Sequence, residues 1–496
     1  MTNFRALFFE NPELRRNLRI ELSPRRVFTA GIITALFALI VLPSLVPSGR
    51  PVGFGRAAVM TPYLMIVLWS QRITLMLGGA ISCWRAVKRE RELNTWDFQR
   101  ITRLSPLELT MGKLFGAPAL AYFVTLCFVP PALFSAATTS SAAVWFVLET
   151  YVVLFTGALV IHTFALMISA ISDRGGAVSG LVLLLLLQIF PIMGFMMFSA
   201  VPSAVQSFGQ AAGVKFYGIA FPLTLLSAVL ELGFSAWFLL AIVRNIKADL
   251  DAMQLFTVGQ GLGFAAYCNF VWIGLYPWQT ASTINTPALL LLSVLLFYMV
   301  GIGVLQSREL VRRELREAGA DFHQTGKLLG PIAWLLGGSI ATEVVILVLV
   351  KQYSAVDAGT TAAQTLFVIL YFAAWLARDL FYLQWMKVRP VHSPLRKAFL
   401  YLGVFYISAS IVFRSALTSN VVGTAAFAAW LSPFPLLRTW TAAQWQDAAG
   451  MWLLALAGQL AAALGFAYLY RQEILGLTVS PRLRPPADPA LSSPTA

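Results

Sequence analysis

Apolar stretches of about 20 residues, separated by shorter polar segments, recur along the whole chain. A stretch of that length crosses a bilayer as a helix, because a helix satisfies its own backbone hydrogen bonds in hydrocarbon. The first half contains six, at 27–46, 59–83, 114–136, 143–170, 177–200 and 217–243. The second half contains six more, at 254–278, 286–305, 328–350, 361–385, 398–415 and 447–470. The pattern predicts an all-α integral membrane protein with about twelve transmembrane helices.

The positions of the basic residues agree with that number of helices. If the N-terminus is cytoplasmic, 29 of the 36 lysines and arginines fall in cytoplasmic segments and six fall outside. Cytoplasmic loops of membrane proteins carry such an excess. We therefore expect both termini in the cytoplasm and the protein in the cell (inner) membrane. Because the N-terminus lacks the apolar core and cleavage site of a signal peptide, we expect the first span to direct insertion.

The two halves of the chain resemble each other in layout. Residues 27–250 and 251–475 each hold six spans, and the largest cytoplasmic loop of each half, 84–113 or 306–327, follows its second span. GKLFGAP begins at Gly112, and GKLLGP begins at Gly326, at the matching position. These echoes favour a duplication into two six-helix repeats that enter the membrane from the same side. The tail, 476–496, is rich in Pro, Ser and Ala and is predicted to be disordered.

Composition narrows the class of protein further. Hydrophobic residues make up 58% and charged residues 12% of the chain, whereas soluble domains carry about 25% charge. This excludes a soluble multidomain enzyme and a disordered chain. Most of the net charge of +14 is explained by loop orientation, so we expect no nucleic-acid partner. The three cysteines and three histidines show no metal-ligand spacing, and no metal site is expected.

Residues 1–26 are predicted to contain an amphipathic helix at the membrane interface. Asn11 precedes Pro12, a combination typical of a helix start. Three leucines then share one face, and three arginines lie off it: Leu14, Leu18 and Leu22, with Arg15, Arg16 and Arg19. Such a helix lies in the headgroup layer. A solvated basic arm is the alternative.

The loop at 84–113 has the pattern of a folded hairpin. Opposite charges alternate through Lys88–Glu92, as on a solvated helix face. Asn94 tolerates the left-handed conformation that ends a helix. Ser105-Pro106-Leu107-Glu108 is a capping box that starts the next helix. A helix, a turn and a capped helix at the membrane surface favour docking to a partner protein.

This loop resembles the cytoplasmic loop of type-2 ABC transporter permeases. That family reads E-x-G-T-x-E, then T-P-L-S-x-x-E-I and G-K, and this chain departs from it at Asn94, Asp97 and Arg103. The N-terminal helix and the six-span layout of the first half are similar to that family as well. The resemblance implies a docking surface for an ATP-binding subunit, formed by Arg89, Glu90, Glu92, Thr95, Trp96, Asp97, Thr102, Ser105, Glu108, Gly112 and Lys113. The loop of the second half lacks the Thr-Leu-Ser segment, which leaves docking there open.

The resemblance implies the permease subunit of an ATP-driven exporter, in which two copies of a separate subunit bind ATP and Mg²⁺. Gly112-Lys113 is followed by Leu114 and not by the hydroxyl residue of a phosphate-binding loop. We therefore expect no cofactor and no ATPase or other enzyme activity in this chain. An ion-gradient-driven secondary transporter and a non-transporting membrane scaffold are the alternatives. The transported substrate is not identified by the sequence.

Ionisable residues inside apolar stretches are costly and mark candidate functional positions. Four stand out: Arg72, His162, Glu231 and Glu343. They could line a substrate path or relay protons. They could equally fix helix packing, for example as a pair between Arg72 and Glu231. The neighbours Arg378 and Asp379 are expected near the cytoplasmic rim, without a special role.

Overall fold

The computed structural model describes residues 7–44, 56–171, 213–248, 254–276, 286–317, 325–353, 362–391, 394–418, 433 and 446–479. The chain divides into two compact units, Met1–Leu255 and Phe256–Ala496. The division lies close to the expected boundary between residues 250 and 251. Each unit is described by itself.

Nine helical stretches among the described residues are long and apolar enough to cross a membrane. They are Pro24–Leu42, Val59–Glu92, Pro106–Thr139, Ser141–Ile171, Leu223–Asn245, Thr286–Val304, Gly330–Gln352, Ala363–Val388 and Ala449–Leu477. Their apolar side chains face outward in quantity, as on helices that meet lipid. The chain is therefore an α-helical, multi-pass integral membrane protein, as the hydrophobic pattern predicted.

Three predicted spans are not among these nine. The stretch 177–200 lies outside the described residues. The stretch 254–278 holds helix α14 (Val258–Leu275), whose 18 residues extend about 27 Å. The stretch 398–415 lies within α19 (Pro394–Thr418), in which Lys397–Ser408 forms a shorter apolar segment. The number twelve and the repeat stay predictions.

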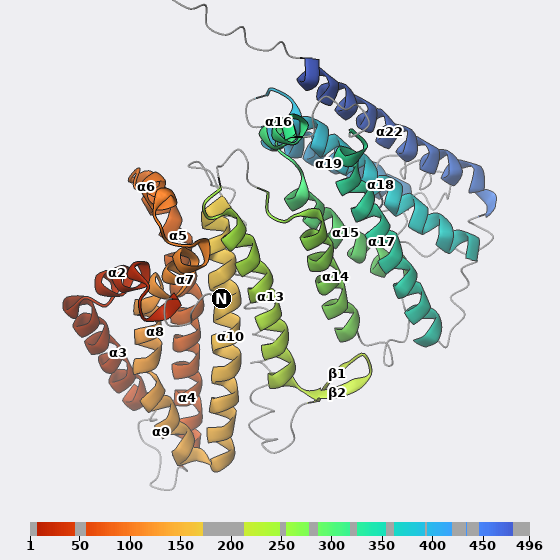
Figure 1. The fold of residues 1–496 in the computed structure, drawn as a ribbon. Helices are drawn as coiled ribbons and strands as arrows, with labels where there is room; N and C mark the ends of the chain where they lie inside the picture. The colour runs from red at the N-terminus through yellow and green to blue at the C-terminus, as the bar shows by residue number, and fades with distance from the viewer. Residues whose placement is uncertain are drawn as a thin grey trace, which may run out of the picture. The chain divides into compact units, whose positions relative to one another are not determined.

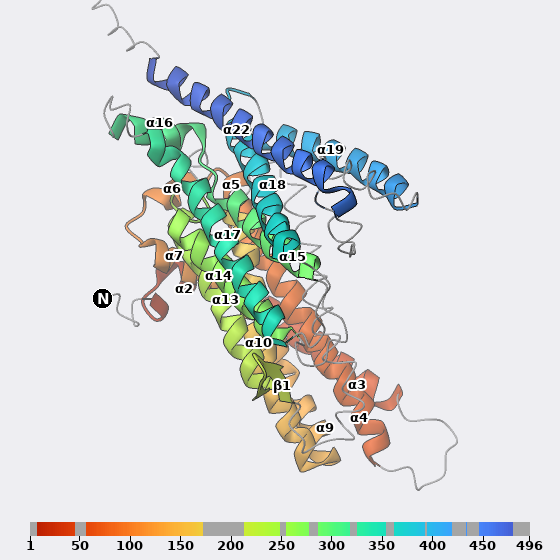
Figure 2. The same cartoon turned by 90° about the vertical axis from the view of Figure 1, so that its right-hand side faces the viewer.

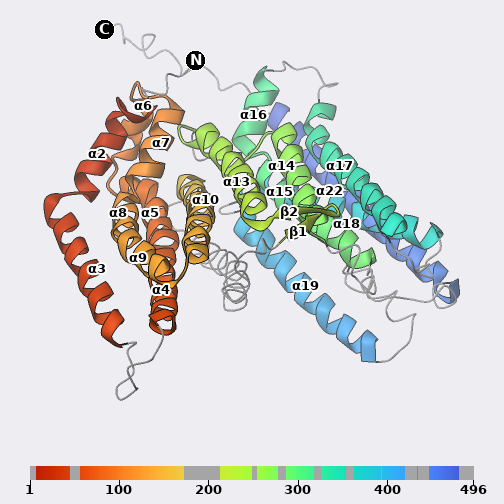
Figure 3. The ribbon, with the colours of Figure 1, turned by 90° about the horizontal axis from the view of Figure 1, so that it is seen from below.

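The first unit is a helical bundle with α10 (Ser141–Ile171) at its centre. Helix α10 packs between α5 (Gly79–Glu92) and α13 (Leu223–Asn245) (Figures 1 and 3). Its other helices are α2 (Pro12–Glu21), α3 (Pro24–Ser44), α4 (Arg56–Arg72), α6 (Trp96–Ile101), α7 (Pro106–Gly116), α8 (Ala119–Cys127) and α9 (Val129–Thr139). A π-helical turn, Ile73–Gly78, joins α4 to α5. The span expected to end at residue 83 therefore continues as one helical rod to Glu92.

A short β-hairpin precedes α13, where the sequence placed the start of a span at residue 217. Strand β1 (Gly213–Phe216) pairs antiparallel with β2 (Ile219–Pro222). Tyr217 and Gly218 both have positive φ, which is the two-residue turn that suits a twisted hairpin. The span therefore begins at Leu223. This β1–β2 pair lies at the end of the first unit opposite to α6 (Figure 1).

The second unit is built around the pair α18 (Ala362–Val388) and α22 (Ala449–Val479), which run side by side (Figures 1 and 2). Phe367, Tyr371 and Trp452 form an aromatic cluster between them. Helices α14, α15 (Thr286–Val304) and α17 (Thr325–Tyr353) pack against one another beside α18. The polar helix α16 (Arg308–Glu317) contacts α18 and α22. Since α22 continues to Val479, the expected tail boundary at 476 falls inside a helix.

Candidate functional site

The loop at 84–113 folds as the predicted hairpin, which includes the end of α5, α6 and the first two turns of α7. Asn94 ends α5 with φ of 55°, the left-handed conformation expected of it. Ser105 starts α7 with a complete capping box, in which Ser105 and Glu108 satisfy each other's backbone N–H groups. We call residues 84–113 the hairpin. Its α6 segment projects beyond α5 and α7 (Figure 1).

A buried charge cluster lies at the base of the hairpin. Lys113 is 1% exposed, and its Nζ donates to Glu13 Oε1 at 3.0 Å and to Glu90 Oε2 at 2.5 Å. Arg16 donates to the same two carboxylates, at 2.9 and 2.5 Å. Gln99 of α6 adds a hydrogen bond to Glu90 at 2.7 Å. Two acids and two bases thus join α2, α5 and α7, and α6 through Gln99. We call Glu13, Arg16, Glu90 and Lys113 the charge cluster.

Two further contacts brace the hairpin against the membrane helices. The Arg91 guanidinium donates to the carbonyl oxygens of Ser169 and Ala170 at the end of α10. Beyond α13, Lys247 donates to the carbonyl oxygen of Thr102 at 2.9 Å. These bonds attach the hairpin to the ends of two of the apolar spans, α10 and α13.

Three large apolar side chains are exposed on the outer surface of the hairpin, among charged and polar ones. Leu93, Phe98 and Ile101 are 62%, 72% and 81% exposed. The Asp97 carboxylate beside them is exposed and lies 3.5 Å from an Arg100 nitrogen. Large apolar side chains at a polar membrane edge mark an interaction surface. We call Leu93, Asp97, Phe98 and Ile101 the tip.

The structure sorts the predicted docking residues into two groups. Exposed, and able to touch a partner, are Arg89, Glu92, Thr95 and Asp97. Buried beneath them are Glu90, Trp96, Gly112 and Lys113, and half-buried are Thr102, Ser105 and Glu108. Leu93, Phe98 and Ile101 are exposed as well, although the family motif does not include them. Phe98 and Ile101 stand out in the sequence as apolar anchors within a charged loop, together with Trp96, whereas Leu93 was not predicted.

The N-terminal helix α2 starts as predicted, because the Asn11 side chain caps the N–H groups of Glu13 and Leu14 and Pro12 follows. The apolar face of this helix lies partly against protein, and its position at the membrane interface stays a prediction. Leu14 is buried against the hairpin base, and Leu18 and Leu22 face α8. Asn11 Nδ2 also donates to the Glu108 carbonyl at 2.7 Å. The helix docks on α7 and α8, while Arg15, Arg16 and Arg19 are exposed.

Three of the intramembrane candidates lie in the first unit and have partners. Arg72 interacts electrostatically with Glu231, and the Thr156 hydroxyl donates to the Glu231 carboxylate. The His162 ring contacts the Tyr122 hydroxyl at 3.0 Å and the Leu75 carbonyl at 2.9 Å. His162 is thus a hydrogen-bonded packing residue, one of the two readings of the sequence. These contacts favour a structural role for all three.

The second unit holds a buried polar cluster around Arg378 and Asp379, for which the sequence indicated no special role. Arg378 and Asp379 are buried and form an ion pair at 2.7 Å. Arg378 also donates to Tyr406 of α19 at 2.6 Å and to Gln459 of α22 at 2.8 Å. The pair joins three helices and is not an idle feature of the rim. Tyr406 and Gln459 were missed because neither is ionisable near pH 7.

Glu343 of α17 stands apart from these clusters. It is fully buried, and one of its oxygens accepts a hydrogen bond from Ser339 at 2.9 Å. Its other oxygen, Oε2, has no hydrogen-bond partner among the described residues. A buried polar atom left without a partner costs stability, which makes Glu343 a candidate functional residue.

No group of three or more metal-ligating side chains occurs among the described residues. Comparison of the chain with protein-family models, with curated proteins and with solved structures finds no match. What the protein does therefore has to be argued from its own residues.

Proposed function

We propose that the chain is the membrane-spanning permease subunit of an ATP-driven ABC exporter, which a separate ATP-binding subunit docks at the hairpin. The observation that carries the proposal is an apolar, exposed tip placed on a base of buried charges. An exposed apolar surface favours a protein partner, since a solvated loop would gain nothing from Phe98 and Ile101. The likeness of 84–113 to the loop of that family names the kind of partner.

The base of the hairpin supplies the coupling that such a subunit needs. The charge cluster binds α2, α5 and α7 together, and Arg91 and Lys247 attach the hairpin to α10 and α13. A displacement of the tip should therefore move several spans together, because breaking the buried ion pairs at the base would cost about 3–5 kcal/mol. The ATP and Mg²⁺ belong to the partner.

The twelve-span, two-repeat arrangement belongs to the same proposal. Nine spans would leave the two termini on opposite sides of the membrane. Adding α14, α19 and the stretch 177–200 restores twelve and the charge bias of the loops. One chain would then supply both halves of a membrane unit in the cell membrane.

The docking proposal is tested by placing a charge on the tip. Phe98→Asp and Ile101→Asp should each reduce the ATPase activity that co-purifies with the tagged chain at least tenfold, because each removes apolar contact area and buries a charge. Ile219→Asp is the matched control, since Ile219 is also well exposed, at 62%, but lies on β2, at the opposite end of the unit. If ATPase activity never accompanies the chain, or survives both tip variants, the docking proposal is wrong.

Glu343 favours one second candidate, a secondary transporter driven by an ion gradient. A buried carboxylate with an unbonded oxygen can take up a proton or a cation. In that case, transport in ATP-free vesicles should follow an imposed proton gradient, and Glu343→Gln should abolish it. Transport that requires ATP and tolerates Glu343→Gln would exclude this candidate.

A further inference from the structure

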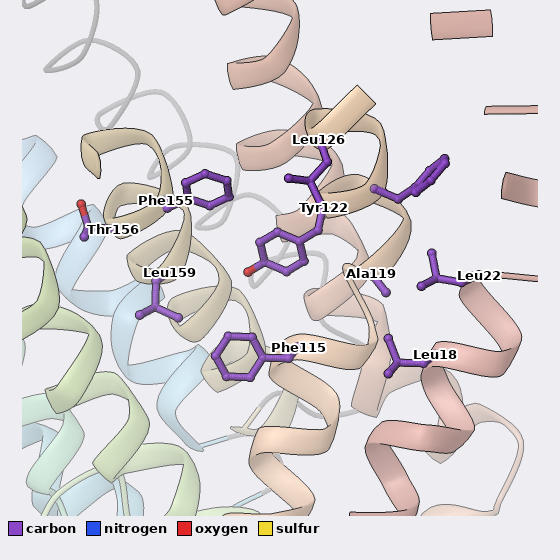
Figure 4. A pocket seen from close by; sticks show the side chains of 10 residues that line it. Leu18, Leu22, Phe115, Ala119, Tyr122, Leu126, Phe155, Thr156 and Leu159 are labelled. Atoms are coloured by element: carbon purple, nitrogen blue, oxygen red, sulfur yellow. The ribbon is translucent and has the colours of Figure 1, made fainter. Parts of the chain in front are cut away.

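An apolar pocket lies where the N-terminal helix meets the bundle of the first unit. Its volume is about 560 Å³. Figure 4 shows its walls, which come from α2, α7, α8 and α10: Leu18, Leu22, Phe115, Ala119, Tyr122, Phe123, Leu126, Phe155, Thr156 and Leu159. Both hydroxyls in this set have partners within the protein, Tyr122 with His162 and Thr156 with Glu231. The pocket thus offers an apolar chain a surface and offers a polar ligand very little.

Two unpaired positive charges lie within one helical turn of Leu22, along the chain. Arg19 and Arg25 are exposed, and neither has a partner among the described residues. Their neighbours differ, because Arg16 joins the charge cluster, Arg15 donates to the Phe9 carbonyl and Arg26 pairs with Glu21 at 2.9 Å. Arg19 and Arg25 therefore carry positive charge that no described side chain neutralises, close in the chain to Leu22, which lines the pocket.

The position of these groups along the chain matches the headgroup level of a bilayer. Arg25 begins α3, which then presents Phe28, Ile32 and Leu36 outward as a lipid-facing surface. Arginine side chains at the end of a span reach toward the phosphate layer. The pocket walls continue from Leu22 along α8 and α10, both of which belong to apolar spans. A ligand placed here would have its charge near α2 and its apolar part among the helices.

We infer that this place binds an anionic phospholipid, with the phosphate on Arg19 and Arg25 and one acyl chain in the pocket between α8 and α10. The charge of the two arginines favours an acidic headgroup, and the apolar lining favours a lipid acyl chain over a polar solute. The lipid holds α2 against the bundle by contact with Leu18 and Leu22. This site needs no ATP-binding partner and can be measured on the isolated chain.

The experiment is native mass spectrometry of the full chain, titrated in detergent with phosphatidylglycerol or phosphatidylcholine of identical acyl chains. The wild-type chain should bind phosphatidylglycerol more tightly. Arg19→Gln with Arg25→Gln should weaken phosphatidylglycerol binding about 25-fold, about fivefold for each arginine, and leave phosphatidylcholine binding unchanged. Leu126→Trp should weaken binding of both lipids, because Leu126 lines the pocket and is exposed enough to accept a larger ring.

Two control variants separate the site from general effects. Arg103→Gln with Arg312→Gln removes the same charge from exposed or partly exposed positions elsewhere and should leave lipid binding unchanged. Leu36→Trp adds the same ring on the outer face of α3, outside the pocket. The inference is overturned if the wild-type chain shows no headgroup preference, or if the arginine control loses as much affinity. It is also overturned if Leu126→Trp binds both lipids like the wild-type protein, since the acyl chain would then not occupy the pocket.

Discussion

Lys113 shows how a residue of a surface motif can act from inside the protein. Its ammonium group is buried between Glu13 and Glu90, and the Trp96 ring lies 5.4 Å from it. Removing one partner from a buried ion pair leaves a charge uncompensated. The motif therefore identified an important position, while the role that the structure gives it is to hold the hairpin.

Lys113→Met should lower the free energy of unfolding by about 3–5 kcal/mol, because two buried carboxylates would then share Arg16 alone. Unfolding in mixed micelles, followed by circular dichroism, measures the change. Arg312→Met is the matched control, since Arg312 and Glu309 form a partly exposed pair on α16 and should change stability by less than about 1 kcal/mol. Equal effects of the two substitutions would contradict the assignment of Lys113 to a buried cluster.

Gly112 permits the close approach of α2 to α7. A Cβ atom there would lie 2.8 Å from Glu13 Cβ and 3.0 Å from the Leu14 backbone nitrogen, so the backbone itself would have to move. Gly112→Ala should destabilise the protein by about 1–3 kcal/mol through overpacking. Gly31→Ala on α3, where nothing lies within 4 Å, should be neutral or stabilise by up to about 1 kcal/mol. If both variants unfold at the same denaturant concentration, α2 does not rest on α7 as described.

At the scale of elements, the local patterns were predicted well and the long-range contacts were not. Asn11, Asn94 and Ser105 each set a helix end through bonds or dihedrals within four residues, so the sequence alone revealed them. The partners of Lys113 lie 23 and 100 residues away, and no periodicity reports such a distance. The β1–β2 hairpin escaped prediction because its strands are only four residues long.

Helix α2 also shows the difference between a local pattern and a long-range contact. Its leucine spacing correctly predicted an amphipathic helix, but an apolar face is equally satisfied by lipid or by protein. Packing on α7 and α8 decides the matter for Leu14, and the small residue Gly112 makes that packing possible. For Leu18, Leu22 and the arginines, the position at the membrane interface stays a prediction.

Three helices of the second unit depend on one buried pair. Arg378→Met should cost about 3–5 kcal/mol in the free energy of unfolding, because Asp379 would remain buried without its counter-ion. The double variant with Asp379→Leu should recover part of that loss, since no charge is then stranded. Unfolding in mixed micelles of both single variants and the double variant gives the coupling energy directly. Strict additivity of the single effects would mean that the two side chains act independently.

The whole molecule poses the question of how many times the chain crosses the membrane. Within the first unit, the hairpin and β1–β2 lie at opposite ends of the bundle, as expected for loops on opposite sides (Figure 1). In the second unit, the side on which α16 lies depends on whether α14 crosses. Its 18 residues extend about 27 Å, close to the thickness of the hydrocarbon core. If α14 did not cross, α16 would be on the outer side.

The side of the membrane on which a loop lies can be measured with single cysteines, introduced into a chain whose three native cysteines are replaced by serine. An impermeant maleimide added to intact cells should label Lys215→Cys and leave Asp97→Cys and Arg312→Cys unlabelled, while permeabilised cells should label all three. Asp97 of α6 and Lys215 of β1 are exposed, and Arg312 of α16 is partly exposed, so each thiol is accessible from its own side. Labelling of Arg312→Cys in intact cells would show that α14 does not cross the membrane. The second half would then not contain six spans. Labelling of Asp97→Cys would put the hairpin on the side without ATP, and the proposed docking partner could not reach it.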